Sequence, residues 1–431
     1  MRSATLILAE LALILFTLTF TRAYNNGVGR APPMGWNSWN LFACDINEQL
    51  IIETIDAMDS KLKKFGYQYV NIDDCWSLKS NRDPVTNEMI PDPVRFPRGI
   101  KFLADYAHSK GLKLGIYSDV GDKTCQGYPG SANHYEIDAK TFAKWEVDYL
   151  KLDWCFVDDA IKAEPWKYYG RMSARIKQYW SSHLLLNLQL VGLGVSKPHE
   201  WAPKIANSWR TTGDINSSWK SVLEILDLNK PLWKYSGPYA FNDPDMLEVE
   251  VDRPPNKLTI DESRTHFTLW CMLNSPLLLG NDIRRLDDQD RKWAKDIITN
   301  EEVIAVSQDP FVKQAQLLYE TKVGTFNQSG ACTSSNCTWI EVWMKPLQKT
   351  QTIAVAVYNR AGLNIKDPKF KAESANIIWK SLGLEEDLKL SVRDLWAHSD
   401  KGSFQKEYTT DKIAPHDVRL YSMSGSGWNR K

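Results

Sequence analysis

The sequence lacks several features that would assign it to a common functional class. Its 53 basic and 53 acidic residues leave no formal net charge, so composition favours neither nucleic acid nor an acidic membrane surface as a partner. No cysteine cluster has the spacing of a zinc site, and no Gly-x-Gly-x-x-Gly follows the first expected strand. After residue 23, no apolar run is long enough to cross a bilayer. We therefore expect a soluble protein without a structural metal or a dinucleotide cofactor.

The first 23 residues have the pattern of a secretory signal peptide. Arg2 precedes an apolar run over residues 11–20, and Thr21-Arg22-Ala23 has small residues at both positions that flank a cleavage site. An uncleaved membrane anchor is the alternative, but the run is short for one. We expect cleavage after Ala23 and a mature protein in the secretory pathway, either secreted or lysosomal.

Seven cysteines fit an oxidising compartment, and their odd number leaves one unpaired. Cys332 and Cys337 are separated by a five-residue step and could close a small loop. Cys271 lies inside an apolar run, which favours a buried free thiol. Three sequons also agree with a secreted glycoprotein, and they begin at Asn216, Asn327 and Asn336.

From about residue 30 to 310, short β-rich runs alternate with longer amphipathic segments. This alternation predicts a parallel sheet with helical crossovers, and eight such units match a closed (β/α)₈ barrel over residues 24–310. An open doubly wound sheet is the alternative. The expected strands are one near Met34 and then residues 67–73, 113–119, 149–153, 183–190, 208–212, 232–236 and 275–280.

After about residue 311, helical periodicity fades and β-rich runs separated by turn residues take its place. The runs cover residues 339–344, 352–358, 389–395 and 417–423. They predict an antiparallel β-sandwich over residues 311–431 that follows the barrel. An extension packed as an insertion of the barrel is the alternative.

Two expected strands end on a carboxylate close to a cation. Lys151 and Asp153 share one face of the strand over residues 149–153, because side chains two apart on a strand point the same way. Arg210 and Asp214 have the same parity, although a turn could break it. Barrels place their chemistry at the carboxyl ends of the strands, and a pair of carboxyl groups there suggests a glycosidase.

Further carboxylates follow other expected strands. They are Asp73, Asp74, Asp119 and Asp245. Acidic strand ends could instead bind a divalent cation. The Lys and Arg residues beside the carboxylates would oppose a cation, so no metal site is expected.

Six motifs, in this order, resemble those of glycoside hydrolase family 27, the α-galactosidases and α-N-acetylgalactosaminidases. They cover residues 31–40 (APPMGWNSWN), 71–76 (NIDDCW), 115–121 (GIYSDVG), 149–155 (YLKLDWC), 208–214 (SWRTTGD) with 219–221, and 242–247 (NDPDML). The resemblance runs from about residue 24 to 424. It implies a barrel followed by a β-sandwich, and a retaining α-galactosidase that removes terminal α-galactose from oligosaccharides or glycoconjugates without a cofactor.

The resemblance also implies roles for individual residues. Asp153 would be the nucleophile that forms a glycosyl-enzyme. Asp214 would be the acid/base that protonates the leaving oxygen and then activates water, with the two carboxyl groups roughly 5 Å apart. Asp73 and Asp74 would bind the hydroxyls at the galactose 4 and 6 positions, and would reject an epimer that leaves them unpaired.

The same resemblance extends to the rest of the expected pocket. Trp39 would form the wall behind the sugar ring, with support from Tyr117 and Asp245. Lys151 and Arg210 would hold hydroxyls near the reacting carbon. The implied disulfides are Cys44–Cys75 and Cys125–Cys155.

One departure from the family pattern affects the expected substrate. After the fifth strand, where the family usually has Cys-Glu-Trp facing the sugar's 2-position, this chain has Gln189-Leu190-Val191. One hypothesis is an altered 2-position pocket in which Gln189 pairs with a hydroxyl or N-acetyl group, and drift in the loop is the alternative. The rival activities are therefore an α-N-acetylgalactosaminidase or a β-L-arabinopyranosidase. A non-catalytic carbohydrate-binding relative is a further rival, and a homodimer is left open.

Overall fold

The computed structural model describes residues 24–180, 187–192, 194, 196–327, 332–349, 351–363 and 367–426. The predicted leader, residues 1–23, lies outside the described residues. No helix in the described ranges combines the length and apolarity that a membrane span requires.

The first part of the chain forms the predicted barrel. Eight parallel strands are hydrogen-bonded in the order β7-β6-β5-β4-β3-β2-β1-β8. The backbone N–H of Leu247, just past β7, donates to the carbonyl of Leu278 at 2.8 Å and closes the seam. The strands are β1 (Met34–Asn37), β2 (Tyr69–Asn71), β3 (Lys113–Asp119), β4 (Tyr149–Asp153), β5 (Asn187–Leu190), β6 (Ser208–Arg210), β7 (Phe241–Asp243) and β8 (Leu277–Leu279).

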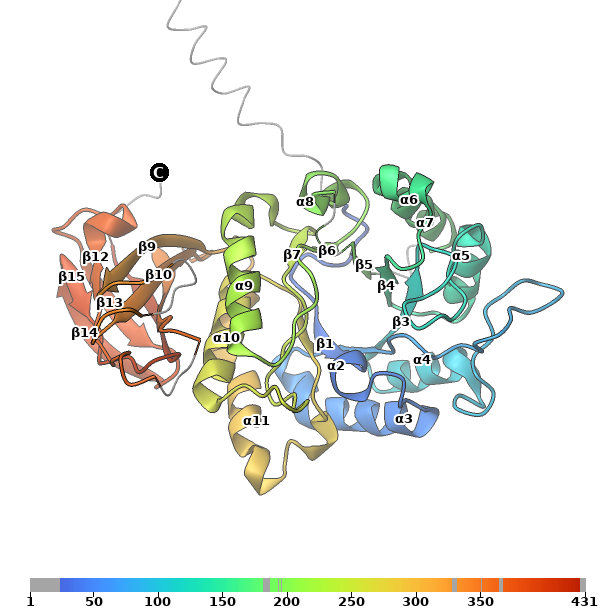
Figure 1. The fold of residues 1–431 in the computed structure, drawn as a ribbon, viewed down its shortest axis with the longest axis horizontal. Helices are drawn as coiled ribbons and strands as arrows, with labels where there is room; N and C mark the ends of the chain where they lie inside the picture. Colours follow the sequence, from blue (N-terminus) through green and yellow to red (C-terminus); the bar gives the residue numbers. More distant parts are fainter. Residues whose placement is uncertain are drawn as a thin grey trace, which may run out of the picture.

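Helices cover the outside of the barrel, as Figure 1 shows. Their apolar residues recur three and four positions apart, as in α4, where Ile100, Leu103, Ala104 and Ala107 are buried against the strands. The longer helices are α3 (Glu48–Ala57), α4 (Gly99–Ser109), α5 (Tyr135–Lys144), α7 (Pro165–Tyr179), α9 (Trp219–Asn229), α10 (Ile260–Met272), α11 (Lys292–Ile298) and α12 (Glu301–Ser307). The shorter ones are α2 (Trp39–Phe42), α6 (Asp159–Ala163) and α8 (Pro198–Trp201).

The seventh strand differs from the prediction. The run over residues 232–236 was expected to be a strand, but Lys230–Tyr235 forms a 3-10 helix that continues from α9. Pro231 fits the first turn of a helix, where no backbone N–H is needed. The strand is instead β7, in which Phe241 pairs with Ser208 and Asp243 with Arg210. Two of its three residues, Asn242 and Asp243, have low strand propensity, so the sequence alone does not predict a strand here.

The C-terminal part forms two antiparallel sheets. A six-stranded sheet has the order β14-β13-β16-β11-β10-β9, and β12 pairs with β15 in a smaller sheet. The strands are β9 (Gln316–Val323), β10 (Thr338–Pro346), β11 (Thr352–Asn359), β12 (Asn376–Ile378), β13 (Lys389–Asp394), β14 (Ser399–Gln405), β15 (Glu407–Thr409) and β16 (Val418–Ser424). The predicted sandwich is thus present, and the expected division at residue 311 falls between α12 and β9.

The central strand β11 of the large sheet is buried on both faces, because it lies between the small sheet and the barrel. In β11, Val355 and Val357 belong to the core shared with Ile377 of β12. Alternate residues, Ala354 and Ala356, pack in the core of the barrel instead. Figure 1 shows the orange and red strands beside α9 and α10.

A buried lysine joins the two parts of the chain. Lys345 of β10 is fully buried, and its ammonium donates to the Cys271 carbonyl at 3.3 Å, to the Asn274 side chain and to the Val306 carbonyl. Burial lowers its pKa to about 7. Since the three acceptors come from the barrel, Lys345 fastens the sandwich to it.

We predict that Lys345→Met destabilises the protein by about 2 kcal/mol, because buried acceptors lose their donor. The free energy of unfolding from urea denaturation measures this loss. Lys380→Met is the control, since Lys380 is exposed, and it should change stability by less than about 0.5 kcal/mol. Equal stability of the two variants would contradict the fastening role.

Candidate active site

A pocket of about 560 Å³ opens at the carboxyl ends of the barrel strands. It brings together every residue of the expected site except Gln189. Those residues are Trp39, Asp73, Asp74, Tyr117, Lys151, Asp153, Arg210, Asp214 and Asp245. They come from segments between residues 39 and 245 because parallel strands all end at the same edge of the barrel.

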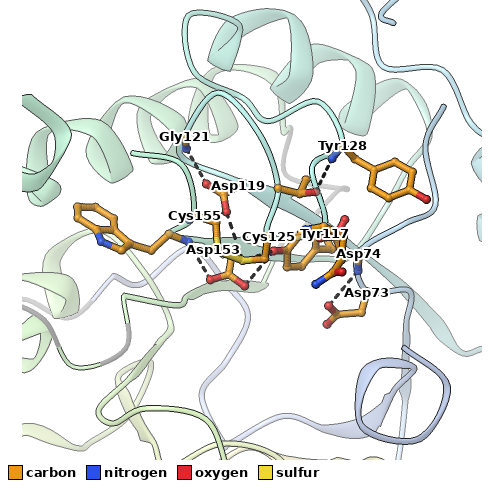
Figure 2. The surroundings of a disulfide bond; sticks show 12 residues. Asp73, Asp74, Tyr117, Asp119, Gly121, Cys125, Tyr128, Asp153 and Cys155 are labelled. Carbon is orange, nitrogen blue, oxygen red and sulfur yellow. Dashed lines mark hydrogen bonds between the residues drawn. A yellow bond between two sulfur atoms is a disulfide. The ribbon is translucent and has the colours of Figure 1, made fainter. Parts of the chain in front are cut away.

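Asp153 ends β4 and is held by two donors. The Tyr117 hydroxyl donates to one carboxyl oxygen at 2.9 Å, and the Trp154 backbone N–H donates to the other at 2.8 Å. Figure 2 shows Asp153 and Tyr117 beside the Cys125–Cys155 disulfide. Burial raises the pKa of Asp153 to about 6, and the charge of Lys151 opposes this rise. The group is therefore ionised above about pH 6.

Lys151 is close to two carboxylates, Asp73 just past β2 and Asp153 at the end of β4. Its ammonium forms an ion pair with Asp73 at 2.8 Å, and Asn37 donates to the same oxygen at 2.7 Å. Lys151 also lies 5.2 Å from the centre of the Tyr117 ring. The predicted sharing of one face by Lys151 and Asp153 is confirmed by their common place in the pocket lining.

Asp74 is fixed by the backbone and by two disulfides. It accepts from the Cys75 N–H at 2.6 Å and from the Gln126 N–H at 2.9 Å. Burial raises the pKa of Asp74. Cys75 is bonded to Cys44, and Cys125, next to Gln126, is bonded to Cys155, so both implied pairings are confirmed. The cross-links hold the loops that carry the acidic residues.

Arg210 organises the opposite side of the pocket. It is almost fully buried and forms ion pairs with Asp245 at 2.8 Å and with Asp214 at 3.1 Å. Asp245 is further held by the Ile215 and Met246 backbone N–H groups. Asp214 lies past the end of β6, and its side chain is 75% exposed. Asp214 therefore lies at the solvent-accessible side of the pocket, where Arg210 holds it by an ion pair.

The remaining cysteines behave as the sequence indicates. Cys332 and Cys337 form a disulfide, and Cys271 is a buried free thiol. Asp119, Cys125, Asp153 and Cys155 lie close enough together to suggest a metal site. Because both cysteines are in a disulfide, they offer no thiolate, and this cluster does not fit a transition metal. Burial raises the pKa of Asp119 to about 8.

Comparison with known proteins places the chain in a family. Residues 31–309 match the family described as alpha galactosidase A, and residues 338–423 match the alpha galactosidase C-terminal beta sandwich domain. The chain belongs to glycoside hydrolase family 27. An alpha-galactosidase from Oryza sativa subsp. japonica is 43% identical over 94% of this chain and 87% of its own length. One from Coffea arabica is 42% identical over 93% of this chain and 95% of its own length.

Solved structures of family 27 have the same fold. Alpha-galactosidase I from Mortierella vinacea is 30% identical, with a TM-score of 0.81, over 94% of this chain and 100% of its own. A Saccharomyces cerevisiae alpha-galactosidase solved with raffinose is 26% identical, with a TM-score of 0.81, over 93% of this chain and 99% of its own.

Gln189 differs from the expectation drawn from the family 27 pattern. It is buried in β5 and is not part of the pocket lining, whereas Val191, two residues on, lines the pocket. The Gln189 amide donates to Asp243 of β7, below the pocket. The Gln189 side chain therefore lies outside the pocket lining in which the hypothesis placed it. Its nitrogen instead partners a buried carboxyl whose pKa burial raises to about 6.

Several lining residues were missed by sequence reasoning. Glu248 is buried at the pocket edge, with Asn40 and Ser217 donating to its two oxygens. Burial raises its pKa to about 7. Arg253 and Asn256 belong to the turn that follows. Glu248 directly follows the sixth motif, and that closeness was the available signal.

We predict that Gln189→Glu destabilises the protein, because two carboxyl groups would share a buried site next to β7. Like charges raise both folded pKa values above the unfolded value of about 4, so stability falls as pH rises from about 4 to 8. Urea denaturation should show a deficit of about 3 kcal/mol at pH 7.5 and a smaller one at pH 5. Gln178→Glu, at an exposed position of α7, is the control. If Gln189→Glu instead weakened substrate binding and left stability unchanged, the hypothesis that Gln189 contacts the sugar would be supported.

Proposed function

We propose that this protein is a retaining α-galactosidase that removes terminal α-D-galactose from oligosaccharides or glycoconjugates. The observation that carries this proposal is the meeting of Asp153 and Asp214 in one pocket. Lys151 of β4 favours the charged form of Asp153, and Arg210 of β6 forms an ion pair with Asp214. The naming of the plant relatives as alpha-galactosidases at 42–43% identity supports the choice of sugar.

The first step transfers the galactosyl group to the protein. A carboxylate oxygen of Asp153 forms a bond to the anomeric carbon while the bond to the leaving oxygen breaks. Asp214 gives its proton to that oxygen, and the alcohol departs. Lys151, Tyr117 and Trp154 keep Asp153 ionised and oriented through the contacts described above.

The second step returns Asp153 to its starting state. Asp214, now a carboxylate, accepts a proton from water, and the hydroxide oxygen bonds to the anomeric carbon as the ester to Asp153 breaks. Two displacements at one carbon retain its configuration. The exposure of Asp214 suits this step, because water and the leaving group can both reach it.

Two buried acidic residues would make the pocket selective for galactose over its epimers. Asp73 and Asp74 are 1% and 2% exposed, and each already accepts hydrogen bonds that fix its direction. Their remaining lone pairs would accept the sugar's 4- and 6-hydroxyls. An epimer would leave a buried acceptor unpaired, which is the stronger form of discrimination. Trp39 would cover the ring.

The rival sugars lose their main support in this chain. Gln189, which suggested an altered 2-position pocket, does not line the pocket. A structural neighbour named as a β-L-arabinopyranosidase is 24% identical, so it carries the fold alone. The three disulfides support the secretory pathway as the place of folding.

We predict that Asp153→Ala and Asp214→Ala each reduce hydrolysis of p-nitrophenyl α-galactoside by at least about 1,000-fold. Azide should distinguish the two roles. It should attack from the vacated side in Asp153→Ala and yield β-galactosyl azide, and it should replace water in Asp214→Ala and yield α-galactosyl azide. Asp159→Ala is the control, since Asp159 is fully exposed on α6. The same azide anomer from both variants would overturn the assignment.

We predict that kcat/KM for this substrate falls below about pH 6, because protonated Asp153 cannot attack. Lys151→Met removes the charge that favours the carboxylate, so the acid limb of the profile should move to higher pH. Lys162→Met, an exposed lysine of α6, should leave the limb in place. An unchanged limb in Lys151→Met would mean that Lys151 does not control Asp153.

A further inference from the structure

Three cations line the pocket in the described part of the chain, and two of them are committed to carboxylates. Lys151 pairs with Asp73, and Arg210 pairs with Asp214 and Asp245. The third, Arg253, is exposed, and the described residues offer its side chain no hydrogen bond and no ion pair within 4 Å. An exposed guanidinium with five donors is therefore available to a ligand.

The Arg253 turn is short and lines the pocket together with the segment that carries Asp214. Arg253 and Asn256 form a β-bridge, with the Asn256 N–H donating to the Arg253 carbonyl at 3.0 Å, and Pro254 lies between them in the lining. Five residues before Arg253, Glu248 accepts from Ser217 at 2.5 Å. Ser217 follows Asp214 by three residues, so the turn and the proposed proton donor border the same part of the pocket.

Glu248 senses the charge of Arg253 but forms no ion pair with it. Glu248 lies close enough for Arg253 to lower its pKa, yet burial dominates and raises that pKa to about 7. Both Glu248 oxygens already accept from Asn40 and Ser217. The other cation of the turn, Lys257, is paired with Asp252 at 2.7 Å. The donors of Arg253 are thus not taken up by either neighbouring acidic group, Glu248 or Asp252.

We propose that Arg253 binds an anionic group on the leaving portion of the substrate, so that galactosides linked to an acidic sugar are preferred over neutral ones. A guanidinium matches the planar fork of a carboxylate, which gives direction as well as charge. This inference rests on the proposed function, since it names the class of alcohol that Asp214 protonates.

Melibiitol and melibionate test the proposal, because they carry the same galactosyl bond to an open six-carbon chain that ends in CH₂OH or in carboxylate. We expect kcat/KM for melibionate to be about fivefold higher at pH 5.5 and 50 mM salt, and the ratio to approach one at 500 mM salt. Arg253→Gln should abolish the preference, whereas Arg253→Lys should keep part of it. The two kcat/KM values of each ratio are measured on the same variant. A smaller fraction of folded protein lowers both values equally and leaves the ratio unchanged.

Lys257→Gln is the matched control, since it removes one charge from the same loop without touching the lining, and it should keep both activity and ratio. A ratio near one in the wild-type protein, or one that Arg253→Gln leaves unchanged, would overturn the inference. If p-nitrophenyl α-galactoside is still cleaved in that case, only the anion preference fails. If no galactoside is cleaved, the proposed function fails with it.

Discussion

The structure depends on carboxyl groups buried at the end of a barrel and on the two cations that make their burial tolerable. A buried charge without a partner costs several kcal/mol, so acidic groups gathered in one pocket require fixed compensation. Lys151 and Arg210 supply it from β4 and β6, and backbone N–H groups supply the rest. The same balance sets the chemistry, because it decides which carboxyl stays ionised. Stability and catalysis therefore rest on one set of ion pairs.

The outer layers of the molecule serve this arrangement. His266 and Trp270, one turn apart on α10, hold the segment behind the pocket: the Glu248 N–H donates to His266 at 3.0 Å, and Trp270 donates to the Asp245 carbonyl at 2.7 Å. Another side of α10 contacts the sandwich, where Thr265 donates to the His416 carbonyl at 2.6 Å. The sandwich is therefore coupled to the site through one helix, although it adds no residue to the pocket lining.

Sequence reasoning succeeded where a local pattern determines the outcome. β3 and β4 have the predicted bounds, because their β-rich runs are continuous and each ends on a carboxylate. The seventh strand was wrong, since three residues with two polar side chains carry too little periodicity, and their strand form depends on pairing with β6. For Gln189, the strand was expected, but its hydrogen bond to Asp243 was not. The depth of a side chain in a barrel depends on strands that are distant in the sequence.

The sequence by itself determined the order of the chemical groups, their places at strand ends and the family to which the chain belongs. These features are local, since two-residue periodicity and short motifs do not depend on the rest of the fold. Only the tertiary structure decided that Glu248 and Arg253 join the pocket, that Gln189 lies beneath it and that Asp214 faces solvent. Loops after strands have no periodicity to follow, and their conformations are set by packing against segments far away in the chain.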